Sequence, residues 1–473
     1  MPTIDLRRRL VELDAQILEQ KRALRDLQQT RITVERELRE TASYPILALP
    51  VEITTEIFHR LPLKVASYSG SGLSSYVAPV SLTAVCRSWR GIALSTPKLW
   101  STMEILFDGV PPTVIAEPGM VELSIHRWLG RSGECPLSLT FILHDNRFPL
   151  SRLRTIVHQY AYRTRYLNLD DFNPMDALEL YSLSFPSLQA ATFRCDSNLE
   201  THVFGNAPQL HSLHMLSLPN EGIVLARLHL PWQQLTTFEG TIHNLDLFVV
   251  APNLIDVKCY WPGQNTPALI THSRLTSLTV IADDTILKYL TLPCLRHLDL
   301  TVELNRYNFV ASFLKRSSPP LISLRAQAAD PAFSQWHNAA LHVAGTLEDL
   351  ELLSPSRGVM ASIFSSWESP GRRTLTALSN LKTLRFLDVL DPVSQHELVH
   401  FLYLRSDKLR SLQLVWYGSP YLYGRTEAGA PGAPAALDTI VGHFSRLRAA
   451  GMDVYVGTED ENYAATNDEA LDA

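Results

Sequence analysis

Histidines, paired carboxylates and a cysteine are the side chains in this sequence that could carry out catalysis or bind a metal. His211 and His214 lie in or beside a strand-like motif, Asp170-Asp171 and Asp283-Asp284 are adjacent acids, and Cys86 carries a thiol. A metal would need a third ligand in register with the histidines, and a thiol nucleophile would need a paired base, which no residue near Cys86 in the sequence supplies. The acid pairs fall in predicted turns, where helix capping accounts for them.

The chain also lacks the sequence motifs of the common enzyme families. It contains no GxxxxGK[ST] or GxGxxG phosphate loop, no GxSxG and no HExxH. The five cysteines are scattered, none forms a CxxC pair, and we expect reduced, buried thiols. We therefore predict no catalytic residue, no cofactor and no metal, and we interpret the chain as non-catalytic.

The clearest pattern is an apolar stripe near the N-terminus. Leu49 and Pro50 open it, and Ile53, Ile57 and Leu61 follow at four-residue steps. This spacing places three aliphatic side chains on one face of a helix, and Pro50 fits its first turn because a proline there loses no hydrogen bond. An aliphatic stripe on a small domain predicts a partner protein that covers it.

A second segment downstream has a related pattern. Val85, Trp89 and Ile92 share a helical face within the run VCRSWRGI, where Cys86 follows Val85. The run PKLW, which ends at Trp100, comes next, and its proline ends the helix.

Together the two segments resemble the F-box, which has an LPxEIxxEIFxxL helix, then VCRxWR, then PxLW, over roughly residues 44–102. The run SYPILALPVEI is similar to that of the large fungal F-box family. The resemblance implies docking to the Skp-type adaptor of a cullin–RING (SCF) ubiquitin ligase. It implies that a first set of residues faces or supports the adaptor: Leu49, Pro50, Ile53, Ile57 and Leu61. It implies that a second set completes the domain core and part of the interface: Val85, Cys86, Trp89, Ile92 and Trp100. Residues 64–80 depart from the family because they are long and rich in Ser and Gly, and we predict a loop there.

Composition narrows the class of protein. The 473 residues are 46% hydrophobic and 19% charged, and the net charge of −6 gives no reason to expect nucleic acid or an anionic membrane as a partner. No apolar stretch reaches the roughly 18 residues of a membrane-spanning helix, and the N-terminus is charged rather than a signal peptide. We therefore expect a cytoplasmic or nuclear protein.

Residues 1–43 carry a heptad pattern with neither Gly nor Pro after Thr3, which predicts one long helix. Steps of four and three residues alternate, and only Gln20 and Arg31 are polar among the positions Leu6, Leu10, Leu13, Ile17, Gln20, Leu24, Leu27, Arg31, Val34 and Leu38. The helix is either a coiled coil, with self-association through residues 3–41, or an amphipathic helix that folds back on its own chain.

After the F-box-like segment one motif returns: a leucine, two residues, an apolar residue, one residue, and a further apolar or small residue. Ten copies, at intervals of roughly 20 to 35 residues, begin at Leu188, Leu210, Leu235, Leu254, Leu275, Leu295, Leu321, Leu347, Leu381 and Leu409, with a weaker copy at Thr164. The motif resembles the leucine-rich repeat, which implies an irregular α/β solenoid with parallel strands on its concave face and helices on its convex side. Most copies lack the Asn or Cys that usually closes the turn, so other groups must close it. The alternative is a set of buried strands in an unrelated α/β fold.

Three further segments depart from the repeat. Residues 118–143 are predicted to form an N-terminal cap, residues 415–435 a long loop, and the acidic end a disordered tail. The expected domains are the helix 1–43, the F-box 44–106, the solenoid with its cap 107–456 and the tail 457–473.

These patterns predict the substrate-recognition subunit of an SCF-type ubiquitin ligase. The F-box would dock to a Skp-type adaptor, and through it to a cullin, while the solenoid would hold a target protein. The alternative is a protein-interaction scaffold that takes no part in ubiquitin transfer. Assembly of the adaptor complex with a cullin distinguishes the two.

Overall fold

The computed structural model divides the chain into two units, Met1–Leu63 with Ala78–Leu99 and Lys64–Val77 with Trp100–Ala473. We refer to them as unit 1 and unit 2. The residues that the structure describes are 2–41, 49–61, 66–69, 72–73, 79–107, 118–143, 150–170, 183–194, 204–216, 228–262, 268–301, 309–327, 342–343, 345–365, 378, 380–389, 393–416, 422–423, 435–458 and 462.

Unit 1 is helical. Its helices are α1 (Pro2–Thr41), α2 (Val51–His59), α3 (Val80–Val85) and α4 (Arg87–Leu94), and the 3-10 turn η2 (Pro97–Trp100) follows them. The uninterrupted α1 agrees with the single long helix that the heptads predict. Its described apolar heptad side chains are each at least half exposed: Leu13, Ile17, Leu24, Leu27 and Val34.

Unit 2 is built on one sixteen-stranded sheet whose strands follow chain order from β3 onwards, with β1 and β2 at one edge. All neighbouring pairs are parallel except β1 and β2. The strands are β1 (Ala66–Ser69), β2 (Gly72–Leu73), β3 (Thr102–Phe107), β4 (Leu137–Leu143), β5 (Thr164–Asp170), β6 (Ala190–Arg194), β7 (Ser212–Leu216), β8 (Thr237–Thr241), β9 (Asp256–Tyr260), β11 (Ser277–Ile281), β13 (His297–Thr301), β14 (Ser323–Gln327), β15 (Asp349–Leu353), β16 (Thr383–Val389), β18 (Ser411–Trp416) and β20 (Asp453–Thr458).

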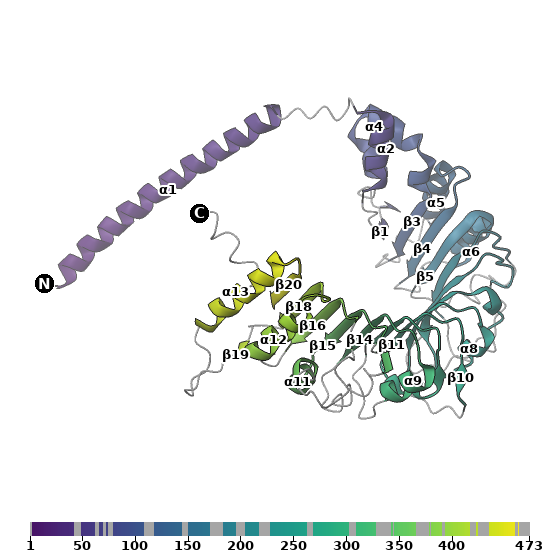
Figure 1. Ribbon diagram of the computed structural model, residues 1–473. Coiled ribbons are helices and arrows are strands. Elements are labelled where there is room, and N and C mark those ends of the chain that lie inside the picture. Colours follow the sequence, from purple (N-terminus) through teal and green to yellow (C-terminus); the bar gives the residue numbers. More distant parts are fainter. Residues whose placement is uncertain are drawn as a thin grey trace. The chain divides into compact units, whose positions relative to one another are not determined.

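Helices connect these strands and lie along the outer side of the curved sheet (Figure 1). They are α5 (Pro118–Arg131), α6 (Leu150–Tyr160), α8 (Leu247–Val250), α9 (Phe309–Ser317), α11 (Arg357–Ser365), α12 (Gln395–Arg405) and α13 (Ala435–Ala449), with the 3-10 turns η3 (Ala161–Arg163), η6 (Trp232–Gln234) and η7 (Asp284–Lys288). Two small parallel pairs accompany them, β10 (Ile270–Thr271) with β12 (Leu290–Thr291) and β17 (Val393–Ser394) with β19 (Leu422–Tyr423). The mixed α/β class with a long parallel-strand sheet is confirmed.

The core of unit 2 repeats from strand to strand because the apolar motif repeats. In the copy that begins at Leu295, that residue, Leu298 and Leu300 are buried, while Asp299 between them is not. A strand turns successive side chains to opposite faces, so each motif buries one face and leaves the other in solvent. Each buried aliphatic side chain contributes roughly 1.5 to 3 kcal/mol to the stability of the fold. The copies stack on one another, and their buried side chains make one continuous core.

Backbone hydrogen bonds tie each repeat to the next just before the strand begins. The carbonyl of Thr276 accepts from the N–H groups of Arg296 (2.8 Å) and His297 (2.9 Å), and the carbonyl of Arg296 accepts in turn from Ile322 (2.8 Å) and Ser323 (3.0 Å). The same double acceptor recurs at Gln189, His211, Thr236, Ile255, Ile322, Glu348 and Lys382. These backbone hydrogen bonds set the register of neighbouring repeats.

Arginines close several turns on the helical side, where the usual Asn or Cys is missing. Arg316, at the end of α9, donates to the carbonyls of Leu287 and Leu290 at 2.6 Å each. Arg405, at the end of α12, donates to the carbonyl of Leu378 at 2.8 Å. A guanidinium has several donors in one plane, so one side chain can satisfy the free carbonyls of the preceding repeat.

Two expectations from the sequence are corrected. Residues 64–80 were expected to form a loop, but β1 and β2 lie there, and β1 pairs in parallel with β3. The segment 118–143 was expected to cap the sheet, but its strand β4 pairs on both sides, with β3 and with β5, and is an ordinary member of the sheet. In the first case pairing with a neighbouring strand outweighs the Ser- and Gly-rich composition, and in the second the strand β3 occupies the edge that β4 was expected to cap.

The C-terminal part contains a strand that the repeat pattern did not indicate, β20, which pairs with β18. Of the predicted loop 415–435, the structure describes the end of β18, the strand β19 and the first residue of α13. Of the predicted tail, Gly457 and Thr458 end β20 and Asn462 is described, while the other residues lie outside the described part.

Candidate protein-docking surfaces

The first candidate surface is the outward face of α2. Ile53, Ile57 and Leu61 are 50%, 41% and 38% exposed, whereas Thr54 and Phe58 on the neighbouring face are buried. The helix begins after Pro50, whose carbonyl accepts from the N–H of Thr54 at 3.0 Å. The four-residue spacing thus leaves one aliphatic stripe in solvent while the adjacent stripe builds the core.

The core beneath this stripe is joined by an aromatic contact between α2 and α4. The rings of Phe58 and Trp89 meet edge to face, with centroids 5.0 Å apart. Cys86 caps α4, because its Sγ accepts from the N–H of Trp89 at 3.4 Å. Arg90 Nε donates to the carbonyl of Thr83 at 2.7 Å and so ties α4 to α3.

The residues predicted to bind an adaptor differ in their exposure. Pro50 and Val85 are exposed like the stripe, and Val85 reaches 59%. Four others are half-buried, namely Leu49, Cys86, Trp89 and Ile92. Two exposed apolar residues were missed by the sequence analysis, Val51 at 56% and Leu94 at 42%; both lie at helix ends, outside the four-residue spacing.

Trp100 belongs to the core of unit 2. Its side chain has no exposed surface, it meets Trp128 edge to face at 5.2 Å, and the guanidinium of Arg131 lies 4.4 Å from its ring centroid. Trp100 therefore offers no surface for direct contact with a partner. Any effect on adaptor binding would have to pass through the packing of unit 2.

The second candidate surface is the open face of the sheet, defined as the face opposite the connecting helices. In each strand of the sheet from β3 to β20, one polar residue near the middle of the strand points to this face, and these residues are register partners from strand to strand. We call this set the middle row: Glu104, Thr140, Asn168, Thr192, His214, Glu239, Lys258, Thr279, Asp299, Arg325, Glu351, Arg385, Gln413 and Tyr455.

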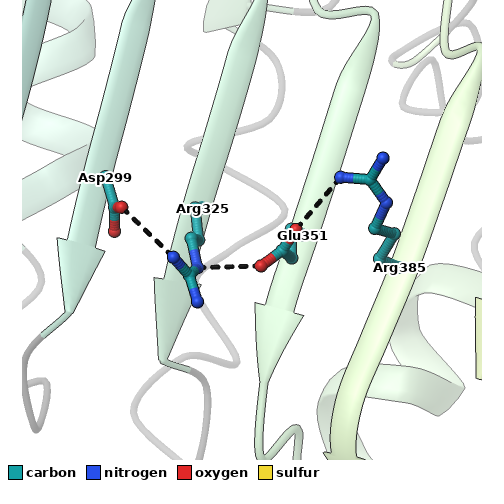
Figure 2. Close-up of polar contacts among 4 residues, drawn as sticks. All are labelled: Asp299, Arg325, Glu351 and Arg385. Carbon is teal, nitrogen blue, oxygen red and sulfur yellow. Dashed lines mark hydrogen bonds and ion pairs between the residues drawn. The ribbon is translucent and has the colours of Figure 1, made fainter. Parts of the chain in front are cut away.

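Four residues of the middle row form a chain of ion pairs that we call the ladder, shown in Figure 2: Asp299, Arg325, Glu351 and Arg385. Arg325 lies 3.6 Å from Asp299 through Nη1 and 2.8 Å from Glu351 through Nε. Arg385 lies 3.2 Å from the second oxygen of Glu351. Glu351 is the most buried member, with 18% of its side chain exposed, so it holds both arginines against the sheet.

A second charged group occupies the middle row on β7 to β9. Lys258 Nζ lies 2.6 Å from Glu239, and His214 Nε2 lies 3.9 Å from the same carboxylate. In the ladder and in this second group, each ion pair joins neighbouring strands of the sheet, although the paired residues are 19 to 34 positions apart in the chain. The open face is therefore organised by cross-strand charge pairing.

A shallow cavity of about 260 Å³ lies over the ladder. Besides the ladder residues, its polar lining includes Ser277, His297, Ser323, Asp349 and Thr383, the first residues of their strands. This volume is below the roughly 300 to 1,000 Å³ of sites that hold small molecules or cofactors. The cavity has room for a side chain of a partner.

The residues considered for catalysis are placed in structural roles. Asp283 accepts from the N–H of Thr285 at 2.7 Å, which is the capping role expected for it. Burial raises the pKa of the Cys259 thiol to about 12, so it stays protonated. His211 and His214 lie on β7 or directly before it, and within the described residues no group of three or more His, Cys, Asp or Glu could hold a metal ion. Asp171 lies outside the described part of the chain.

Among the described helices, none combines the length and the apolar character that a bilayer span requires. Residues 46–105 match the family described as F-box-like. A search of curated proteins found no matching relative. Domains of this family generally bind Skp-type adaptors, and at the level of the family they act as adaptor or substrate-receptor subunits of SCF-type ligases without catalytic chemistry of their own. The match covers α2 and α4 and the aromatic contact that joins them.

Proposed function

We propose that this chain is the substrate-recognition subunit of an SCF-type cullin–RING ubiquitin ligase. One observation carries the proposal: within the F-box-like segment, Ile53, Ile57 and Leu61 form a continuous aliphatic stripe that remains exposed. Burying apolar surface is worth roughly 25 cal/mol per Å², so a stripe of this kind favours a partner that covers it. A Skp-type adaptor is the partner that the family supplies.

The adaptor would rest on α2 and the flanking exposed residues. Pro50, Val51 and Val85 extend the apolar area beside the stripe. Beneath the stripe, Trp89 packs on Phe58 and Cys86 caps α4, while Leu49 and Ile92 are half-buried. A stable interface buries on the order of 800 Å² per partner, which exceeds what one helix face offers. The contact would therefore extend beyond α2.

The open face of unit 2 would hold the target protein. It is a leucine-rich-repeat-like surface, polar along its whole middle row, and ion pairs fix the side chains of the ladder in place. Side chains that are held in advance lose less conformational entropy on binding. Catalysis would come from proximity, because the receptor holds the target near a conjugating enzyme carried by the cullin-bound subunits. We place this assembly in the cytoplasm or nucleus.

Self-association through residues 3–41 is part of the proposal. The described heptad side chains of α1, from Leu13 to Val34, are exposed apolar groups along one helix, and a second copy would cover them. A Leu24→Asp substitution should convert a dimer to a monomer in light scattering. The matched control is Arg22→Asp, which lies outside the apolar heptad positions. A monomeric wild-type chain would contradict this part.

The central test is co-purification with a Skp-type adaptor, wild type against Ile57→Asp. A buried uncompensated charge should weaken binding by at least about thirtyfold. Leu123→Asp is the matched control, because Leu123 on α5 of unit 2 is 41% exposed, as is Ile57, but lies outside the F-box stripe. Undiminished adaptor binding by Ile57→Asp would overturn the proposal.

The scaffold alternative predicts a different result in the same system. Both docking surfaces and the exposed heptad residues of α1 would bind proteins in a scaffold as well. An adaptor complex that recruits a cullin supports the ubiquitin ligase. An adaptor complex that excludes the cullin supports the scaffold.

A further inference from the structure

The ladder cavity has a charge balance that is set by its ion pairs. Arg325 is shared by Asp299 and Glu351, and Arg385 is held by Glu351. The two arginines and two acids of the ladder therefore neutralise one another. An acidic ligand would have to displace Glu351, the most buried of the four.

Asp349 adds a negative charge to this balanced set. It is the first residue of β15, half-buried, and lines the cavity between Ser323 and Thr383, its register partners on β14 and β16. Among the described residues its carboxylate makes no ion pair or side-chain hydrogen bond. The cavity thus offers one uncompensated carboxylate with a hydroxyl on each side. All three groups can accept hydrogen bonds from a positively charged side chain.

The same sign continues along the open face. The first residues of the strands from β3 to β20 form a row that contains Asp256, Asp349 and Asp453, and no lysine or arginine. In the middle row, Lys258 is paired with Glu239 at 2.6 Å, as the ladder arginines are paired with their acids. The lysine and the ladder arginines of the middle row are therefore already paired, while in the first row Asp256 and Asp453 are exposed and Asp349 is half-buried.

We propose that the open face binds a basic, extended segment of the target, with one lysine or arginine side chain in the ladder cavity against Asp349. The proposal rests on the proposed function for the source of this segment. The cavity volume of about 260 Å³ suits one long side chain rather than a cofactor. Arginine and lysine supply only donors, which match the carboxylate of Asp349 and the hydroxyls of Ser323 and Thr383 beside it.

The strand spacing sets the spacing of basic residues in such a segment. Neighbouring strands lie about 4.8 Å apart, so Asp349 is about 14 Å from Asp453 and about 19 Å from Asp256 along the sheet. An extended chain advances roughly 3.4 Å per residue. Basic residues about four and six positions apart would therefore face the three acids.

The test uses a fluorescein-labelled peptide of glycine and serine with lysines at positions 1, 5 and 11, and its arginine and glutamate versions. Fluorescence anisotropy with the full chain should detect binding of the basic peptides and none of the glutamate peptide. Asp349→Asn should weaken binding about fivefold, as loss of one exposed charge pair does. Glu134→Gln, which removes an exposed acid in the turn after α5, should leave binding within about twofold.

A second variant gives the opposite prediction. Arg325→Gln removes one positive charge from the cavity lining and leaves Glu351 paired with Arg385 alone, so binding of the lysine peptide should become several-fold tighter. Loss of binding in Arg325→Gln with an unchanged melting temperature would overturn the proposal, as would tighter binding of the glutamate peptide. Asp349→Asn should still co-purify with the adaptor, so failure of peptide binding and failure of adaptor docking are read separately.

Discussion

The indole ring of Trp89 packs edge to face on the ring of Phe58, with ring centroids 5.0 Å apart and planes at 65°. Phe58 lies on α2 and is 2% exposed, and Trp89 lies near the start of α4. The contact joins the two segments whose motifs resemble the F-box. It therefore fixes the helix that carries the exposed stripe of Ile53 and Ile57.

Truncation of Trp89 should unfold the docking module before the rest of the chain. Trp89→Ala removes the ring on which Phe58 packs, and we expect a loss of about 2 to 4 kcal/mol in the stability of unit 1. Trp89→Phe keeps a ring, and Trp89 Nε1 has no hydrogen-bond partner to lose. The phenylalanine variant should therefore lose under about 1.5 kcal/mol of the stability of unit 1. Hydrogen exchange of the α2 and α4 amides in the full chain measures both, and equal protection in the two variants would contradict the role of this contact.

Cys86 should act as a helix cap and not as a nucleophile. Its Sγ accepts from the N–H of Trp89 at 3.4 Å, a long contact that an oxygen could shorten. Cys86→Ser should therefore match or exceed the wild-type stability, whereas Cys86→Ala should lose about 0.5 to 1 kcal/mol. Thermal unfolding of the three proteins decides this, and a serine variant less stable than the alanine variant would contradict it.

The buried half of the solenoid was predictable because it depends on spacing within one repeat. Leu298 and Leu324 follow their leading leucines at the same interval, and both are buried as the motif indicates. The strand β20 was missed because Gly451, rather than a leucine, stands three positions before its buried Val454. The buried Met452 comes one position later, so a motif defined by leucine at a fixed spacing finds only part of the repeats.

The exposed half was not predictable in this way. Arg325 and Glu351 are 26 positions apart, and only the register of β14 against β15 brings them within 2.8 Å. That register depends on the backbone hydrogen bonds between repeats and on the length of each connection. These lengths vary from repeat to repeat. In the F-box-like segment the spacing did indicate which face of α2 is aliphatic, but not that Trp100 is fully enclosed by unit 2.

Gly240 occupies a motif position where most other copies bury a larger side chain. A Cβ there would lie 2.6 Å from the carbonyl oxygen of Met215 on the neighbouring strand, closer than side chains tolerate. We expect Gly240→Ala to destabilise unit 2 by about 1 to 3 kcal/mol, because the strand β8 or β7 must shift.

The control for this substitution is Gly442→Ala in α13. A Cβ at Gly442 meets nothing within 4 Å, and alanine favours a helix by up to about 1 kcal/mol over glycine. Urea unfolding should therefore move in opposite directions for the two variants. A neutral Gly240→Ala would mean that the spacing of β7 and β8 is looser than described.

Asp284 should make the stability of the solenoid depend on pH. Its side chain is 1% exposed on η7, which packs against α9, and its Oδ1 has no hydrogen-bond partner. Burial, and then the charge of Asp283, raise the pKa of Asp284 from 3.8 to about 7. The folded state favours the protonated acid. The stability that protonated Asp284 contributes to folding is therefore fully present below about pH 4 and is lost as the pH rises through 7.

An Asp284→Asn substitution separates this charge from the shape of the side chain. The amide cannot ionise, so the variant should gain on the wild type as the pH rises, by about 2 to 3 kcal/mol more at pH 8 than at pH 5. Asp246→Asn, which removes an exposed carboxylate before α8, is the matched control. Urea unfolding of the three proteins at both pH values provides the measurement. A constant difference between Asp284→Asn and the wild type would show that the carboxylate is hydrated or paired when folded, and the turn η7 would then have to open to water.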